Sequence, residues 1–211
     1  MGLIEKGPLQ AVAKSGSPPI QWCCSPIWPI DKGNKKVGPK SKRPICGVCP
    51  FARAYTRAKI RKKPIPVKWF AYGAIKKRRR EEAIAIIWNF KAKCMRAKKS
   101  HLNVFRDAAG AFTSITHESV RTNFKKHRSE DEAEFFYKLH TNSHLTLESH
   151  GTYRVKKGTL QGHSIGGDVF IDGYGNQVEE YARGKERIQD KIKWGEEAHD
   201  LSVTTFVDDI G

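Results

Sequence analysis

The spacing of hydrophobic residues predicts a helix most clearly over residues 81–99. Apolar side chains recur there at the three- and four-residue intervals of one helix face, and lysines and arginines fill most of the remaining positions. The apolar face consists of Ile84, Ile87, Trp88, Cys94 and Met95. Glu81 and Glu82 stand at the N-terminal end, where the helix dipole favours acidic side chains. We therefore expect one strong, basic, amphipathic helix.

After residue 100 the pattern changes to short segments of β character separated by turns. The expected strands are Leu102–Arg106, Ala111–Thr116, Leu145–Glu148, Thr152–Lys156, Asp168–Asp172 and Leu201–Val207. Ser129 and Glu132 occupy the N-cap and capping-box positions of a helix that continues over Ala133–Leu139. A charged surface helix, interrupted at Gly184, is expected over Glu179–Trp194. Residues 101–211 thus predict a mixed domain of β-hairpins and helices, with a β-sandwich or jelly-roll-like domain as the alternative.

Residues 1–50 contain eight of the ten prolines. Such a composition does not bury a core by itself, so we expect an extended, basic, proline-rich N-terminal arm. The chain then divides into this arm, a basic segment with the helix over residues 51–100, and the domain over residues 101–211. The expected fold class is α+β.

Positive charge is concentrated in one third of the chain. The net charge is +17, and residues 31–100 hold 23 Lys and Arg against three Asp and Glu. Charge of this density has a polyanion as its natural counterpart. No apolar run approaches the roughly 20 residues of a membrane span, and the first residues do not resemble a signal peptide. We expect a nucleic-acid partner, no membrane partner, and a nuclear or cytoplasmic rather than secreted protein.

Most of the Lys and Arg residues that we expect to bind phosphate fall in three basic clusters, Pro39–Arg43, Lys59–Lys63 and Lys76–Arg80. These candidates are Lys40, Lys42, Arg43, Arg53, Arg57, Lys59, Arg61, Lys62, Lys63, Lys76, Lys77, Arg78, Arg79 and Arg80. The clusters also match nuclear import signals, so an import receptor is a second expected partner.

Aromatic residues are interleaved with these clusters and are suited to stacking on unpaired bases, which favours RNA or single-stranded DNA. They are Phe51, Tyr55, Trp69, Phe70 and Tyr72. The alternative interpretation is a solvated run of charge beside ordinary core aromatics.

Cys46 and Cys49 form a C-x-x-C pair whose spacing suits a zinc knuckle. A complete site needs two more ligands, for which the sequence offers the adjacent Cys23 and Cys24, together with Cys94 or His101. We select Cys24, Cys46, Cys49 and Cys94 as the candidate ligands of a structural zinc ion. Unliganded thiols remain the alternative.

Two patterns could carry catalysis. Residues 162–167 read G-x-S-x-G and resemble the nucleophile elbow of α/β hydrolases, but the polar segment before them does not suit the buried strand that the elbow requires. A metal-dependent nuclease is the stronger enzyme alternative. Its candidate ligands are His140, His144 and His163 together with Asp168 and Asp172. We expect no enzyme activity, because surface and hydrogen-bonded histidines in a β-rich domain explain the same pattern.

In layout, a basic proline-rich arm ahead of a mixed domain, the chain resembles viral RNA- or DNA-binding proteins and coat proteins, and ribosomal proteins share that layout. The sequence therefore predicts a non-enzymatic nucleic-acid-binding protein that binds phosphate groups through residues 31–100. A viral coat protein or silencing-suppressor-type protein, acting as a homo-oligomer, is the alternative. Composition does not distinguish RNA from DNA.

Overall fold

The computed structural model describes residues 7–33, 37–38, 41–73, 75, 77–101, 111–148, 150–160, 162–163, 165–183, 191–194 and 197–200. These residues form two compact units. Unit 1 consists of residues 1–65 and 110–169, and unit 2 of residues 66–109 and 170–211. Each unit therefore combines two separate stretches of the chain.

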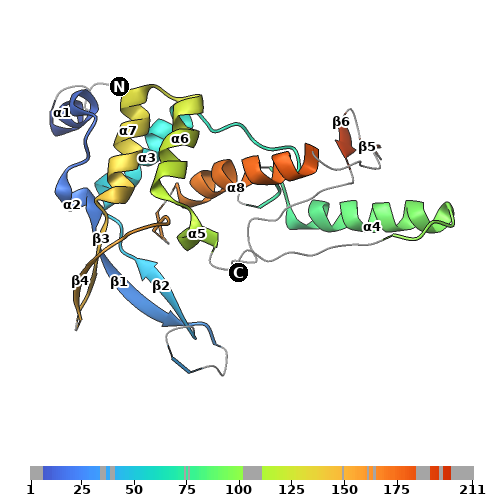
Figure 1. Ribbon diagram of the computed structural model, residues 1–211, viewed down its shortest axis with the longest axis horizontal. Coiled ribbons are helices and arrows are strands. Elements are labelled where there is room, and N and C mark those ends of the chain that lie inside the picture. The colour runs from blue at the N-terminus through green and yellow to red at the C-terminus, as the bar shows by residue number, and fades with distance from the viewer. Residues whose placement is uncertain are drawn as a thin grey trace. The chain divides into compact units, whose positions relative to one another are not determined.

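Helices and strands are mixed in unit 1 (Figure 1). Its elements are α1 (Pro8–Ser15), α2 (Ile20–Cys23), β1 (Cys24–Asp31), β2 (Lys42–Cys46), α3 (Pro50–Lys62), α5 (Ala111–Ser114), α6 (His117–His127), α7 (Glu130–Thr141), β3 (His144–Leu147) and β4 (Gly151–Arg154). Unit 2 contains α4 (Arg80–Arg96), most of α8 (Gly166–Arg183), β5 (Lys191–Trp194) and β6 (Glu197–Asp200). The α+β class expected from the sequence is confirmed.

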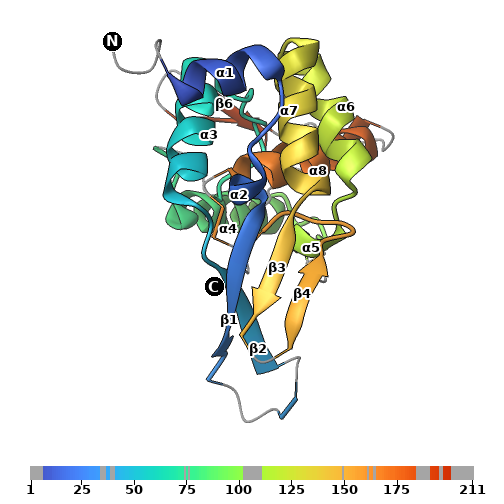
Figure 2. The ribbon, with the colours of Figure 1, turned by 90° about the vertical axis from the view of Figure 1, so that its left-hand side faces the viewer.

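The four strands of unit 1 form one mixed sheet in the order β2-β1-β3-β4. The first part of β1, from Cys24 to Pro26, pairs in parallel with β3, and the second part, from Ile27 to Asp31, pairs antiparallel with β2. β3 and β4 form an antiparallel hairpin. The helices of the unit gather at one end of these strands (Figure 2).

The core of unit 1 lies mainly among the helices α1, α2, α3, α6 and α7, where Cys46 at the end of β2 joins it. Trp22 packs against Tyr55 and Phe135 with ring centroids 5.4 Å and 6.4 Å away, and Phe124 stacks on Phe136 at 4.4 Å. Buried aromatic side chains of this size contribute most of the apolar surface that a small core removes from water.

The N-terminal segment is not an extended arm over its described residues. It forms α1, α2, β1 and β2, and it contributes Val12, Trp22, Cys23 and Cys46 to the core. Proline does not prevent this, because Pro50 occupies the first turn of α3, where a missing N–H costs nothing. In the antiparallel pair of β1 and β2, Pro29 lies opposite Pro44, so the two residues that lack an N–H occupy the same position of the strand pairing.

The helix expected over residues 81–99 is confirmed as α4, although its buried side differs from the predicted face. Ala83 and Ile86 are buried, whereas Ile84, Trp88 and Met95 are exposed. The predicted helix is thus correct, but its packed side carries Ala83, Ile86 and Phe90, which cluster with Tyr72 from the segment before the helix.

The strands expected over residues 145–148 and 152–156 are confirmed as β3 and β4. Two other strand predictions are wrong: residues 111–114 form α5, and residues 168–172 lie inside α8. The apolar run Val169–Ile171 suits a buried helix as well as a buried strand, and packing decides between the two.

The charged helix expected over Glu179–Trp194 is confirmed only in its first part, because α8 ends at Arg183 and Lys191–Trp194 form β5, paired with β6. The expected strands Leu102–Arg106 and Leu201–Val207 lie outside the described residues. A β-sandwich is not what the described residues after 110 form, since most of them are helical.

Candidate nucleic-acid interface

Helix α3 has one face in the core and one face in solvent. Ala52, Thr56 and Ile60 are buried at four-residue intervals, and the Thr56 hydroxyl donates to the Ala52 carbonyl at 2.7 Å, which satisfies it within the helix. A helix has 3.6 residues per turn, so residues that are four apart lie on nearly the same side of it. The residues that directly follow the buried ones therefore form a second row, which is exposed. That row is an arginine stripe.

The arginine stripe consists of Arg53, Arg57 and Arg61, all exposed. With Pro50, Ala54 and Ala58 they line a shallow groove on the surface of α3. A rise of 1.5 Å per residue separates successive arginines by about 6 Å along the axis, and the stripe therefore extends over about 12 Å. The small alanines beside it leave room for a ligand to approach the guanidinium groups.

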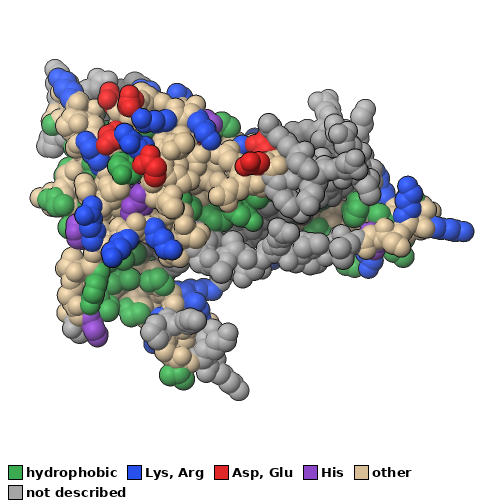
Figure 3. Space-filling model, viewed as in Figure 1, with side chains coloured by type: hydrophobic (Ala, Val, Ile, Leu, Met, Phe, Trp, Pro, Cys, Tyr) green, Lys and Arg blue, Asp and Glu red, His purple; other side chains and the backbone are tan. Residues whose placement is uncertain are grey.

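The charges on α6 and α7 are arranged differently, because they neutralise one another. Arg121 lies 3.2 Å from Glu134, and Lys125 lies 2.7 Å from Glu130. The hydrogen bond and charge of Lys125 hold the pKa of Glu130 below its usual value. Figure 3 shows acidic side chains interspersed with Lys and Arg on this side of unit 1.

Within the part of the chain that the structure describes, neither Arg57 nor Arg61 has an acidic partner. Among the described residues, the charges of Arg57 and Arg61 are thus not balanced by an acidic side chain, whereas Arg121 and Lys125 of α6 are paired with Glu134 and Glu130 of α7.

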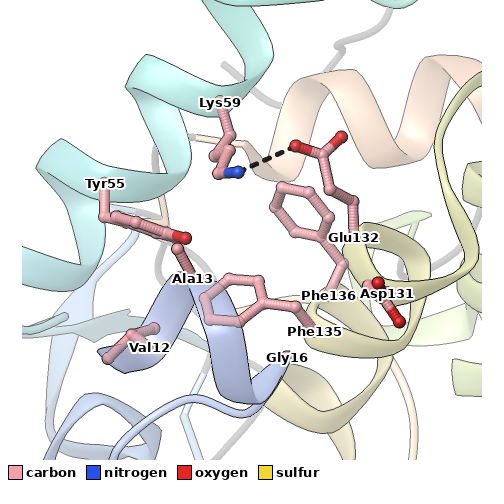
Figure 4. Close-up of a pocket in the computed structure, with 9 residues that line it drawn as sticks. All are labelled: Val12, Ala13, Gly16, Tyr55, Lys59, Asp131, Glu132, Phe135 and Phe136. Carbon is pink, nitrogen blue, oxygen red and sulfur yellow. Dashed lines mark hydrogen bonds and ion pairs between the residues drawn. The ribbon is translucent and has the colours of Figure 1, made fainter. Parts of the chain in front are cut away.

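Lys59, another candidate phosphate ligand, points inward from α3. Its ammonium lies 2.9 Å from Glu132 of α7, beside a cavity lined by α1, α3 and α7 (Figure 4). Burial alone would lower the pKa of Lys59, but the hydrogen bonds and charges of Glu132 and Tyr55 together outweigh burial, so the pKa is raised. The cavity has a free volume of about 20 Å³, which is about the size of one water molecule. Through its ion pair with Glu132, Lys59 links helices α3 and α7.

Arg128 completes this link from the start of α7. Its guanidinium is fully buried, donates to Glu132 at 3.3 Å, and donates to the carbonyl oxygens of Lys59 and Lys63 at the end of α3. The rings of Phe124 and Phe136 lie 5.7 Å and 5.6 Å from it. This buried group therefore fixes the C-terminal end of α3, and with it the direction of the arginine stripe.

The other described candidate phosphate ligands are divided between the two units. Lys42 pairs with Asp31 at 2.8 Å, Arg43 is exposed on β2, and Lys62 and Lys63 are exposed at the end of α3. Lys77, Arg78, Arg79 and Arg80 belong to unit 2. Lys40 and Lys76 lie outside the described residues.

Arg78 has a visible structural role in unit 2. Its guanidinium donates to the carbonyl oxygens of Lys68, Trp69 and Ala71 at 2.7, 3.0 and 2.5 Å, and lies 5.3 Å from the ring of Tyr72. These contacts hold the loop before α4.

The aromatic residues proposed for stacking divide into core and surface groups. Phe70 and Tyr72 are buried and Tyr55 packs in the core, whereas Phe51 is 70% exposed and Trp69 is 38% exposed. Trp28, which is not among the residues expected to stack on bases, is 52% exposed on β1. Its position could have been inferred from the alternation of side chains along a strand, had residues 24–31 been recognised as one.

The candidate zinc ligands are distributed over both units. Cys46 is buried at the end of β2, Cys49 is half-buried before α3, Cys24 is exposed on β1, and Cys94 belongs to unit 2. The buried member of the adjacent pair is Cys23, whose pKa is raised to about 11 by burial and by the neighbouring Cys24. Among the described residues, no three His, Cys, Asp or Glu side chains are arranged to hold a metal ion.

Two of the candidate nuclease histidines lie in the core of unit 1. His140 and His163 are buried with ring centroids 6.3 Å apart, and burial lowers their pKa values to about 4 and about 3. Burial also raises the pKa of Asp168, while His144 is half-buried on β3 and Asp172 is buried in α8. Neutral histidines that pack in this way are typical of a core.

Comparison with known proteins adds no assignment. No family model matches the chain, and no curated protein is similar to it. In the described part of the chain, none of the helices combines the length and hydrophobicity needed to cross a lipid bilayer.

Proposed function

We propose that this protein binds nucleic acid without acting on it chemically, and that the arginine stripe of α3 is its principal phosphate-binding surface. The observation that carries this proposal is the row Arg53, Arg57 and Arg61, exposed at regular spacing, with no acidic partner described for Arg57 or Arg61. The concentration of positive charge in residues 31–100 supports it.

Guanidinium groups suit this role because each one offers a planar pair of donors that matches two phosphate oxygens. A row of them along a rigid helix follows a phosphate backbone without reading base identity. Binding through such contacts releases condensed counterions, so affinity falls steeply as salt increases.

The proposal is tested by fluorescence anisotropy with labelled single-stranded RNA and DNA over a series of salt concentrations. Each phosphate contact contributes about 0.7 to the slope of log affinity against log salt for single strands. Replacing Arg53, Arg57 and Arg61 by Gln should therefore reduce that slope by about 2 and weaken all sequences to a similar extent.

A matched control removes the same number of charges from residues that are already paired. These are Lys42, Arg121 and Lys125, each replaced by Gln. The control should change the slope much less. An unchanged slope in the stripe variant, or an equal change in both variants, would contradict the proposal.

A further inference from the structure

The sheet of unit 1 has an outer face that the helices do not cover. Along β1, Ser25 is buried and Ile27 packs against the core, so the alternating positions Pro26, Trp28 and Ile30 lie on the opposite face. Trp28 is 52% and Ile30 is 53% exposed. Because Pro26, Trp28 and Ile30 are neighbours on the same face of one strand, their exposed surfaces form a continuous apolar strip, and contiguous apolar surface of this kind indicates a contact site more than single side chains do.

The strand register shows which residues share this face. Trp28 lies opposite Ile45 and Ile30 opposite Arg43 on β2, while Pro26 lies opposite Thr146 on β3, which in turn lies opposite Thr152 on β4. The remaining members of the face are Cys24, His144 and Arg154.

The charge of this outer face is entirely positive. Its edge strands carry Arg43 and Arg154, both exposed, and none of the residues that the register places on it is acidic. Asp31, the acid on β1, lies on the other face, opposite Lys42. The face therefore combines an exposed indole, hydroxyl groups and two cations, which complements an anionic ligand that also has flat, apolar parts.

The indole of Trp28 is held in place. It lies directly against Gly47, where a Cβ atom would come within 2.5 Å of the ring. The Gly47 N–H donates to the Pro26 carbonyl at 2.8 Å and fixes the backbone beneath the ring. One side of the ring is thus supported while about half of the residue's surface stays in solvent, so little rotamer freedom remains to be lost on binding.

The stripe on α3 begins close to this ring. Gly47, which supports Trp28, and Pro50, which opens the groove of the arginine stripe, are three positions apart in the sequence. Three residues span at most about 11 Å, and three or fewer nucleotides of one strand cover the same distance, because an unpaired strand extends at least as far as the about 3.4 Å per nucleotide of a duplex. Neighbouring nucleotides of one strand can therefore reach both surfaces.

We propose that the outer face of the sheet is a base-stacking platform, on which Trp28 stacks an unpaired base of the strand whose phosphates lie on the arginine stripe. This inference rests on the proposed function and adds the ligand class: single strands or unpaired loops rather than duplex. Bases inside a duplex are already stacked and present only their edges, so Trp28 has no ring surface to contact there.

The test compares three labelled ligands of equal length: a single strand, an abasic strand with the same phosphates and no bases, and a duplex. The wild-type protein should bind the single strand more tightly than the abasic strand. Trp28→Leu, which keeps an apolar group against Gly47, should weaken single-strand binding by about 5- to 100-fold, the range for loss of one stacked base. Binding of the abasic strand should not change.

Two further variants separate stacking from folding and from the phosphate contacts. Trp28→Phe keeps a ring and should retain most of the single-strand affinity. The Gln variant of Arg53, Arg57 and Arg61 should weaken all three ligands, including the abasic strand.

The platform is overturned if Trp28→Leu leaves single-strand affinity unchanged, if it weakens the abasic strand equally, or if it alters the oligomeric state in light scattering, which would mean that a second copy covers the face. Equal wild-type affinity for the single strand and the abasic strand would also overturn it and leave the proposed function standing. Failure of the wild-type protein to bind any of the three ligands would overturn both.

Discussion

Acidification should destabilise unit 1 through a row of buried histidines. The ring of His140 lies 6.2 Å from that of His117 and 6.3 Å from that of His163. His117 Nε2 lies 3.2 Å from the Gly158 carbonyl and His140 Nδ1 lies 2.7 Å from the Phe136 carbonyl. Protonating these rings would bring positive charges together inside the core.

The size of the effect follows from the pKa values in the folded state. Burial lowers the pKa of His140 to about 4, and burial together with the positive charges of His140 and Arg53 lowers the pKa of His163 to about 3. In the unfolded chain both histidines have a pKa of about 6.5. Because the folded-state values are lower, this stability is complete above about pH 6.5 and is lost progressively as pH falls toward the folded values.

At pH 5, each of these two histidines should lower the free energy of unfolding by about 2 kcal/mol relative to pH 8, and the two together by about 4 kcal/mol. The pKa of His117 is also lowered by burial and acts with the same sign. A loss of this size is a large part of the about 5–15 kcal/mol that stabilises a typical domain. Glu132, whose pKa is lowered by its bonds to Lys59 and Arg128 despite burial, contributes only at lower pH.

The assay is urea unfolding followed by circular dichroism at pH 8 and pH 5. Replacing His140 and His163 by Gln should lower the free energy of unfolding at pH 8 and remove most of the difference between the two pH values. His150→Gln, at an exposed position, is the matched control and should keep the full difference. Equal stability of the wild type at both pH values, or an undiminished difference in the double variant, would refute the reasoning.

Two further predictions concern packing within unit 1. Arg128→Ala removes the buried partner of an ion pair and should lower the free energy of unfolding by about 3–5 kcal/mol. Arg121→Ala, at a more exposed pair, is the control and should lower it by at most about 1 kcal/mol. If urea unfolding gave similar losses for the two variants, Arg128 would not have the structural role assigned to it. Gly158 and Gly151 both have a φ of 89°, but a Cβ on Gly158 would lie 2.6 Å from the Thr113 Cα, whereas nothing lies within 4 Å of one on Gly151. Gly158→Ala should therefore lower the melting temperature clearly more than Gly151→Ala, and equal shifts would show that backbone strain alone matters.

Local signals in the sequence are sufficient to predict several of the helices and strands. Ser129 is the N-cap of α7, with its hydroxyl accepting from the Glu132 N–H. The periodicity of residues 81–99 located α4, and alternation located β3 and β4. In each case the determining interaction lies within a few residues, which is why the sequence alone contained it.

Other features depend on contacts between distant residues. β1 contains Pro26 and Pro29 and is a strand because β2 and β3 pair with its two halves. The candidate site shows the same limit: Arg57 and Lys59 have similar sequence contexts, and only the packing of α3 against α7 turns Lys59 inward and leaves Arg57 in solvent. No local pattern distinguishes such neighbours.

The divided pairing of β1 has a consequence for synthesis of the chain. Cys24–Pro26 pair with β3, which is translated only after the whole of α4, α6 and α7. Until then the nascent N-terminal segment presents an unpaired strand edge, with Trp22 and Cys23 lacking most of the core that later covers them. Unit 1 therefore has to close late, around a long intervening stretch, and until residue 144 is made this strand edge is open to pairing with other chains.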